Sequence, residues 1–158
     1  MAGVMKGGRA LQAHLQQAVE KLQTKTLRVG FLEGATYPDG TPVAQVAALN
    51  EFGHTVAADE GEYFVLPRPF FRNMIHENKA GWGAALGAVL KSTGYDVDKA
   101  LATMGLGMED QLQESIRQLT SPPLAESTIA RKGFDKPLID SSHMINSTGS
   151  DVVEGSGE

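Results

Sequence analysis

Histidines and a short acidic cluster are the residues best suited to bind a metal ion. Four histidines are spread along the chain: His14, His54, His76 and His143. No two of them have the spacing of a known zinc motif. The acidic residues Asp59, Glu60 and Glu62 lack the twelve-residue calcium-loop pattern with its glycine and terminal glutamate. We therefore expect no bound metal, and we interpret the histidines as surface or packing residues and the acidic cluster as a solvated loop.

Motifs for covalent catalysis or nucleotide binding are missing from the sequence. Cysteine is absent, which excludes disulfides, thiolate metal sites and cysteine nucleophiles. There is no Gly-x-Ser-x-Gly and no phosphate-binding P-loop, and Gly105-Leu106-Gly107 lacks the third glycine of a dinucleotide-binding loop. We expect no enzymatic activity and no cofactor. A small hydrolase with an active site of scattered residues stays open as an alternative.

The charge balance bears on binding to nucleic acid. The 158 residues include 14 Lys and Arg against 19 Asp and Glu, a net charge of −5. A protein that wraps duplex DNA needs an excess of basic residues to neutralise phosphates, so this composition argues against that class. A DNA-binding accessory protein remains a second alternative. The small basic groups around Arg68 and Arg72, and around Arg131, are either ordinary surface charge or contacts to phosphate or a subunit.

These residues must be positioned by a fold that the periodicity predicts to be α+β, with one domain over residues 1–158. Helices are expected from Gly7-Gly8 to Thr24 and over 42–52, 69–93, 97–121, 124–132 and 141–147. Asp96 is the expected cap of the helix over 97–121, and Asp140 that of the last. Strands are expected over 27–32, 63–66 and 148–153, in one small, mostly antiparallel sheet packed by the helices. Residues 54–66 form a loop or hairpin. We expect flexible ends at about 1–8 and 150–158 and a mobile loop at about 54–62.

Three aromatic residues are predicted to lie in the core, because each stands on an apolar stripe beside a helix end. They are Phe52, Phe70 and Trp82. Gly53 is expected to end the helix that contains Phe52, and Pro69 to start the helix of Phe70 with a rigid turn. Asn50 and Glu51 can pair with backbone donors or with Arg68.

Two pairs of segments carry a resemblance to a known family. The first pair is VAQVAALNEFG at 43–53 and LPRPFFR at 66–72; the second is PLAESTIARKG at 123–133 and KPLID at 136–140. In sequence and order they resemble motifs of small neck and tail-component proteins of long-tailed double-stranded DNA bacteriophages, over about residues 27–147. One departure is that the family usually continues with Thr-Gly after the aspartate, where this chain has Ser141-Ser142.

The resemblance implies a structural virion protein of a tailed phage or prophage. Such a protein would form a homo-oligomeric ring around the DNA channel at the head–tail junction and act in neck assembly or tail completion. Its partners would be copies of itself and neighbouring neck, tail-tube or head-completion proteins, with DNA only as passing cargo and no membrane. It would assemble in the host bacterial cytoplasm. A tail terminator ring that caps the tail tube is the alternative within this class.

The same motifs provide candidate residues for assembly. The candidate subunit-contact residues are Asn50, Glu51, Arg68, Arg72 and Asp140. The residues expected to fix the local fold are Phe52, Gly53, Pro69, Phe70, Gly133 and Pro137. Arginine makes directional bonds to carboxylates, so we expect the Arg68/Arg72 region to face a neighbouring subunit. As a surface residue, Arg72 is expected to tolerate charge reversal without loss of the fold.

Overall fold

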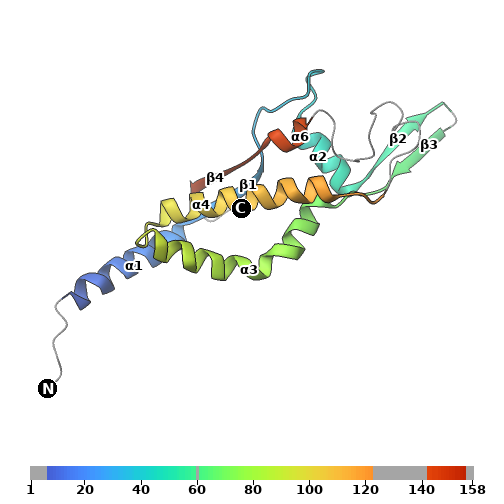
Figure 1. Ribbon diagram of the computed structural model, residues 1–158. Helices are drawn as coiled ribbons and strands as arrows, with labels where there is room; N and C mark the ends of the chain where they lie inside the picture. The colour runs from blue at the N-terminus through green and yellow to red at the C-terminus, as the bar shows by residue number, and fades with distance from the viewer. Residues whose placement is uncertain (1–6, 60, 123–141, 156–158) are drawn as a thin grey trace.

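The computed structural model describes residues 7–59, 61–122 and 142–155, and their arrangement is shown in Figure 1. The helices are α1 (Gly8–Thr24), α2 (Val43–Phe52), α3 (Phe70–Ser92), α4 (Val97–Gln118) and α6 (His143–Asn146). The strands are β1 (Lys25–Phe31), β2 (His54–Ala58), β3 (Gly61–Val65) and β4 (Thr148–Glu154). The predicted α+β class is confirmed. The helix expected over 124–132 lies outside the described residues.

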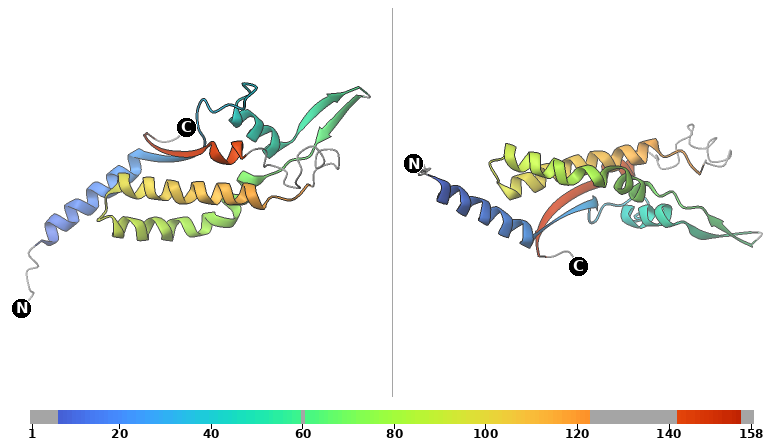
Figure 2. Two further views of the ribbon diagram at one scale, coloured as in Figure 1. Left: turned by 45° about the horizontal axis from the view of Figure 1, so that its top comes forward. Right: turned by 90° about the horizontal axis from the view of Figure 1, so that it is seen from below.

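The body of the molecule has three layers with α4 in the middle. Helix α3 lies along one side of α4, and the antiparallel pair β1–β4 lies along the other. Helices α2 and α6 close one end of this body (Figure 2). The main core is at that end; its buried side chains are Val43, Ala47, Phe70, Met74, Leu112, Ile116, Leu119, Met144 and Ile145. A smaller cluster of Ala18, Val97 and Leu101 lies at the other end.

The strands form two separate ribbons, so the expected single sheet is wrong. Strand β1 pairs with β4, with Leu27 opposite Val152, and β2 pairs with β3, with His54 opposite Val65. Residues 61–65 pair with the neighbouring strand β2 across a short turn. Closing this short loop costs less chain entropy than pairing with the distant strands β1 and β4. Of the loop or hairpin expected over 54–66, the hairpin is confirmed, and most of the mobile loop expected at 54–62 is strand. The expected flexible end is also wrong for 150–154, because β4 continues to Glu154 against β1.

Two elements project from opposite ends of the body (Figures 1 and 2). At one end α1 extends outward, and its one buried residue is Ala18, whereas Leu11 and Val19 are exposed. At the other end is the β2–β3 hairpin, residues 54–65, which we call the arm. Its two strands pack mainly on each other. Apolar residues on both projecting elements thus face solvent.

The three predicted core aromatics have three different outcomes. Phe70 is 1% exposed, which confirms its prediction. Trp82 is half-buried against the core, and its Nε1 donates a hydrogen bond of 2.9 Å to Gln111 Oε1. Phe52 is 66% exposed, so its core prediction is wrong. It occupies the last position of α2, where the chain leaves the body for the arm, and its ring lies 5.4 Å from the guanidinium carbon of Arg72.

Local signals located most of the helix ends. Asp96 caps α4 by accepting a 3.1 Å hydrogen bond from the Lys99 amide, as predicted. Gly53 ends α2 with φ of 76°, and a Cβ there would lie 2.6 Å from the Val65 carbonyl oxygen, so only glycine fits. Helix α2 begins one residue later than expected, after Pro42. Helix α6 begins at His143, after Ser142, and its predicted cap, Asp140, lies outside the described residues.

Two glycines of α4 provide a matched test of the contact between α4 and the β1–β4 pair. A Cβ on Gly105 would meet Ser150 Oγ and lie 2.9 Å from Ser150 Cβ, whereas Gly107 has open space around it. We expect Gly105→Ala to lower the free energy of unfolding by about 1–3 kcal/mol through overpacking. Gly107→Ala should raise it by up to about 1 kcal/mol through helix propensity. Urea denaturation measures both, and a stabilising Gly105→Ala would contradict the close packing of α4 on β4.

The burial of Phe70 gives a second stability prediction. Phe70→Ala should lower the free energy of unfolding by about 3–5 kcal/mol, because it removes a buried ring from the main core. The control is Leu106→Ala on the exposed face of α4, which should change stability by less than about 0.5 kcal/mol. Equal unfolding midpoints for the two variants would show that the Phe70 ring is not buried.

Candidate functional site

A buried carboxylate joins the last turn of α2 to the first turn of α3. Glu51 is only 5% exposed. Its Oε2 accepts a 2.9 Å hydrogen bond from the Phe71 amide, and its Oε1 accepts bonds from the Arg72 amide at 3.2 Å and from Arg72 Nε at 2.7 Å. Arg72 Nη2 also donates to the Glu51 backbone carbonyl at 2.7 Å. We call this group, Glu51 with Phe71 and Arg72, the Glu51 clamp.

The clamp satisfies backbone groups that the start of α3 leaves unpaired. The first amides of a helix have no partner within the helix, and the position before α3 is Pro69, which offers no side-chain cap. Glu51 supplies the acceptor from another helix, and its negative charge is favoured at a helix N-terminus. Glu51 therefore acts as a distant cap. Its expected pairing with backbone donors is confirmed, and its side-chain partner is Arg72 and not Arg68.

Arg72 is both an internal partner and a surface residue. Its side chain is more than half exposed while it bonds to Glu51. Charge reversal by Arg72→Glu would place a second carboxylate beside a buried one. From this contact we expect Arg72→Glu to destabilise the fold, in place of the tolerance expected for an ordinary surface position.

Arg68 and Asn50 lie beside the clamp at the base of the arm. The Arg68 amide donates a 2.6 Å bond to the Asn50 carbonyl, and Asn50 Nδ2 donates a 2.9 Å bond to the Val46 carbonyl within α2. The Asn50 side chain thus turns back onto its own helix. In the part of the chain that the structure describes, the buried Nε of Arg68 has no hydrogen-bond partner. Burial lowers the pKa of the Arg68 guanidinium.

An apolar groove of about 290 Å³ adjoins the clamp. It is lined by aromatic and alanine side chains, with the clamp charges beside them: Phe31, Ala44, Ala47, Ala48, Glu51, Phe52, Phe70, Phe71 and Arg72. This groove was not predicted from the sequence. The signal for it was the spacing of Ala44, Ala47 and Ala48, which puts three small residues on one face of α2.

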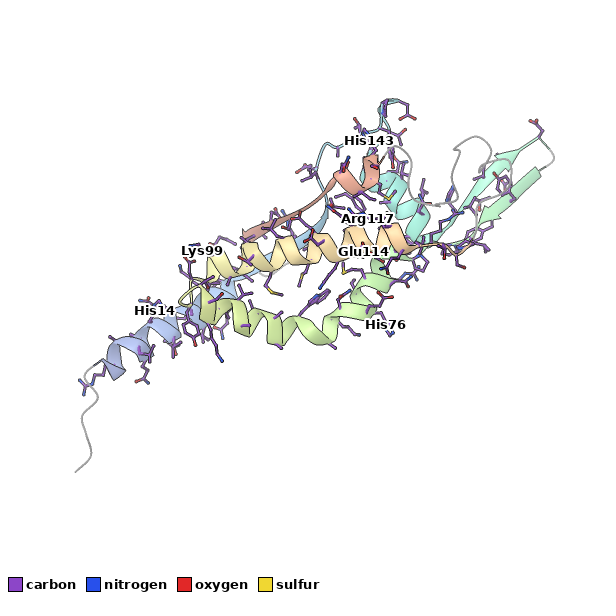
Figure 3. All side chains as sticks on the ribbon, in the orientation of Figure 1. His14, His76, Lys99, Glu114, Arg117 and His143 are labelled. Atoms are coloured by element: carbon purple, nitrogen blue, oxygen red, sulfur yellow. The ribbon has the colours of Figure 1, made fainter. Side chains whose placement is uncertain are left out.

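The histidines lie on different elements, and Figure 3 shows His14, His76 and His143 well separated. His14 Nε2 is 2.8 Å from the Gly94 carbonyl, and His143 Nε2 is 2.9 Å from the Thr36 carbonyl. His54 Nδ1 is 3.2 Å from the Leu49 carbonyl. Among the described residues, no group of three or more metal-binding side chains comes together. In the same residues, no helix is long and apolar enough to cross a membrane.

The structure thus brings together four of the five candidate contact residues at the base of the arm: Asn50, Glu51, Arg68 and Arg72. The fifth, Asp140, and the motif residues Gly133 and Pro137 lie outside the described residues. Comparison with protein-family models, curated proteins and solved structures finds no match to this chain.

The geometry of the Glu51 clamp predicts that removing the Glu51 side chain lowers stability more than removing the Arg72 side chain. Glu51→Ala should lower the free energy of unfolding by about 2–4 kcal/mol, because it leaves two amides of α3 unpaired. Arg72→Ala should cost only about 1 kcal/mol, because its side chain is more than half exposed and the buried carboxylate keeps both amide donors. Chemical denaturation of both variants measures the difference. Equal losses would mean that the ion pair, and not the capping of α3, holds the two helices together.

Proposed function

We propose that this chain is a structural subunit of a tailed phage or prophage virion, assembled as a ring around the DNA channel at the head–tail junction. The resemblance of residues 43–53 and 66–72 to neck and tail-component motifs suggests the class. The observation that carries the proposal is the projecting arm, because its surfaces are suited to contact with another subunit. The proposed role requires neither catalysis nor a cofactor.

The arm exposes apolar side chains and unpaired strand edges. Tyr63 is 55% exposed and Phe64 is 56% exposed. A two-stranded hairpin is only marginally stable alone in water, and open edges invite pairing with other strands. A monomeric protein gains nothing from such an element, whereas a ring subunit buries it against its neighbour. The arm therefore favours a function in assembly.

The layout of the whole molecule also supports a ring. Helix α1 and the arm project from opposite ends of the body, and both expose apolar residues (Figure 2). Two different contact surfaces at opposite ends favour head-to-tail association, in which each copy meets two neighbours through unlike surfaces. Such contacts form a closed ring when a whole number of equal rotations from one copy to the next adds up to a full turn.

The charge of the chain is compatible with a channel for DNA. A net charge of −5 means that a ring of many copies carries a strongly negative surface. A negative channel wall repels phosphate groups, so DNA passes without being held. The same net charge is equally compatible with ordinary solubility.

Self-association is the first test of the proposal. The purified chain should form one closed oligomer of defined mass as its concentration rises, measured by native mass spectrometry and light scattering. Deleting its gene from the encoding phage or prophage should give filled heads and unattached tails by electron microscopy. Joined, infectious particles in the deletion strain would contradict the role at the head–tail junction.

A further inference from the structure

The groove beside the Glu51 clamp is an apolar surface that needs an occupant. At about 290 Å³ it is at the lower limit of small-molecule pockets, and alanines and aromatic rings make most of its lining. Phe52 at its edge is exposed. These features fit one or two apolar side chains of another protein better than a cofactor.

We propose that the arm of one copy docks on another copy of this chain, with Tyr63 in the groove. The inference rests on the proposed function for the ring, but the contact between arm and groove is tested separately below. Tyrosine is enriched at protein interfaces, because its ring buries a large apolar area while its hydroxyl bonds to polar groups at the rim.

Strand register selects Tyr63 rather than Phe64. The two residues point to opposite faces of the arm, since side chains alternate along a strand. Phe64 lies against Gly53 of its own chain: a Cβ on Gly53 would be 2.7 Å from Phe64 Cζ. Tyr63 stands opposite Val56 on the other face and is 55% exposed. Both rings are more than half exposed, but Tyr63 lies on the face of the arm away from Gly53, so we assign Tyr63 to the contact with a second molecule.

The occupant comes from another copy because the arm points away from its own groove. Strands β2 and β3 run outward from α2 and α3 (Figures 1 and 2). The base of the arm is fixed by the pairing of His54 with Val65 and by the bond from the Arg68 amide to Asn50. The arm therefore does not fold back over α2 of the same chain.

Charge complementarity favours the arm over α1 as the occupant. Exposed Asp59 lies in the turn of the arm and exposed Glu62 precedes Tyr63 in β3, whereas Arg72, more than half exposed, lines the groove beside its partner Glu51. Opposite charges at the rim of an apolar contact favour the correct pairing. The other projecting element, α1, carries Arg9 near its exposed Leu11 and would bring like charge to the same rim.

A cross-linking experiment tests the contact directly, because the chain has no cysteine of its own. One preparation carries Val56→Cys beside Tyr63, and a second carries Ala48→Cys in the groove. After mixing, a short thiol-specific linker should join the two proteins. The control replaces Ala48→Cys with Ala102→Cys, an exposed position on α4, and should give no product. No product from the Val56/Ala48 pair, or equal products from both pairs, would overturn the proposal.

Substitution of the docking side chain gives an independent readout. Tyr63→Ser should raise the concentration for half-assembly by roughly tenfold or more, whereas Tyr63→Phe, which keeps the ring, should change it little. Circular dichroism should show the same helix content in both variants, because Tyr63 is exposed in the single chain. Assembly of Tyr63→Ser at the parent concentration would overturn the inference.

A double variant separates this inference from the proposed ring. A chain with both Val56→Cys and Ala48→Cys should give a ladder of cross-linked products that continues beyond the dimer. A ladder that stops at the dimer supports docking of the arm in the groove but contradicts the ring. A ring detected by native mass without any cross-link overturns the docking and leaves the ring standing.

Discussion

The buried Glu51 carboxylate is the interaction on which the rest of the structure depends. It bonds two amides at the start of α3 and the guanidinium of Arg72, so it ties the end of α2 to the start of α3. The arm leaves α2 and returns to α3 at this point. The groove is also formed between the same two helices. One ion pair with backbone bonds thus fixes both surfaces that we propose as contacts, and fixing their relative position lowers the entropy cost of assembly.

The body behind the clamp holds these surfaces in place. Ser115 Oγ on α4 donates a 2.6 Å bond to the Phe70 carbonyl, which fixes the first turn of α3 on α4. On the other side of α4, Gly105 lets the helix approach Ser150 of β4 more closely than any larger residue would allow. Dense packing of this kind keeps the helices and strands of the body rigid relative to one another. A ring requires such rigidity, because a small error in the angle between copies prevents closure.

Local sequence signals predicted the parts of this structure that depend on neighbouring residues. The spacing of apolar residues identified α3 and α4, Asp96 marked a helix start, and Phe70 was correctly placed in the core. Exposed Phe52 was misplaced, because an apolar residue at the solvent-exposed end of a helix has the same periodicity as one that faces a core. The role of Glu51 was only partly predicted: its charge at the end of a short helix suggested pairing with backbone donors, but its partners lie twenty residues further along the chain.

The central claim is that the arm is a contact between copies of this chain, and hydrogen exchange measures this most directly. Amide exchange of residues 54–65 should be fast in dilute, monomeric protein, because an isolated hairpin opens at low cost. In the assembled oligomer the same amides should become strongly protected, while amides of α4 serve as the unchanged reference. Equal exchange of residues 54–65 in the two states would contradict the account.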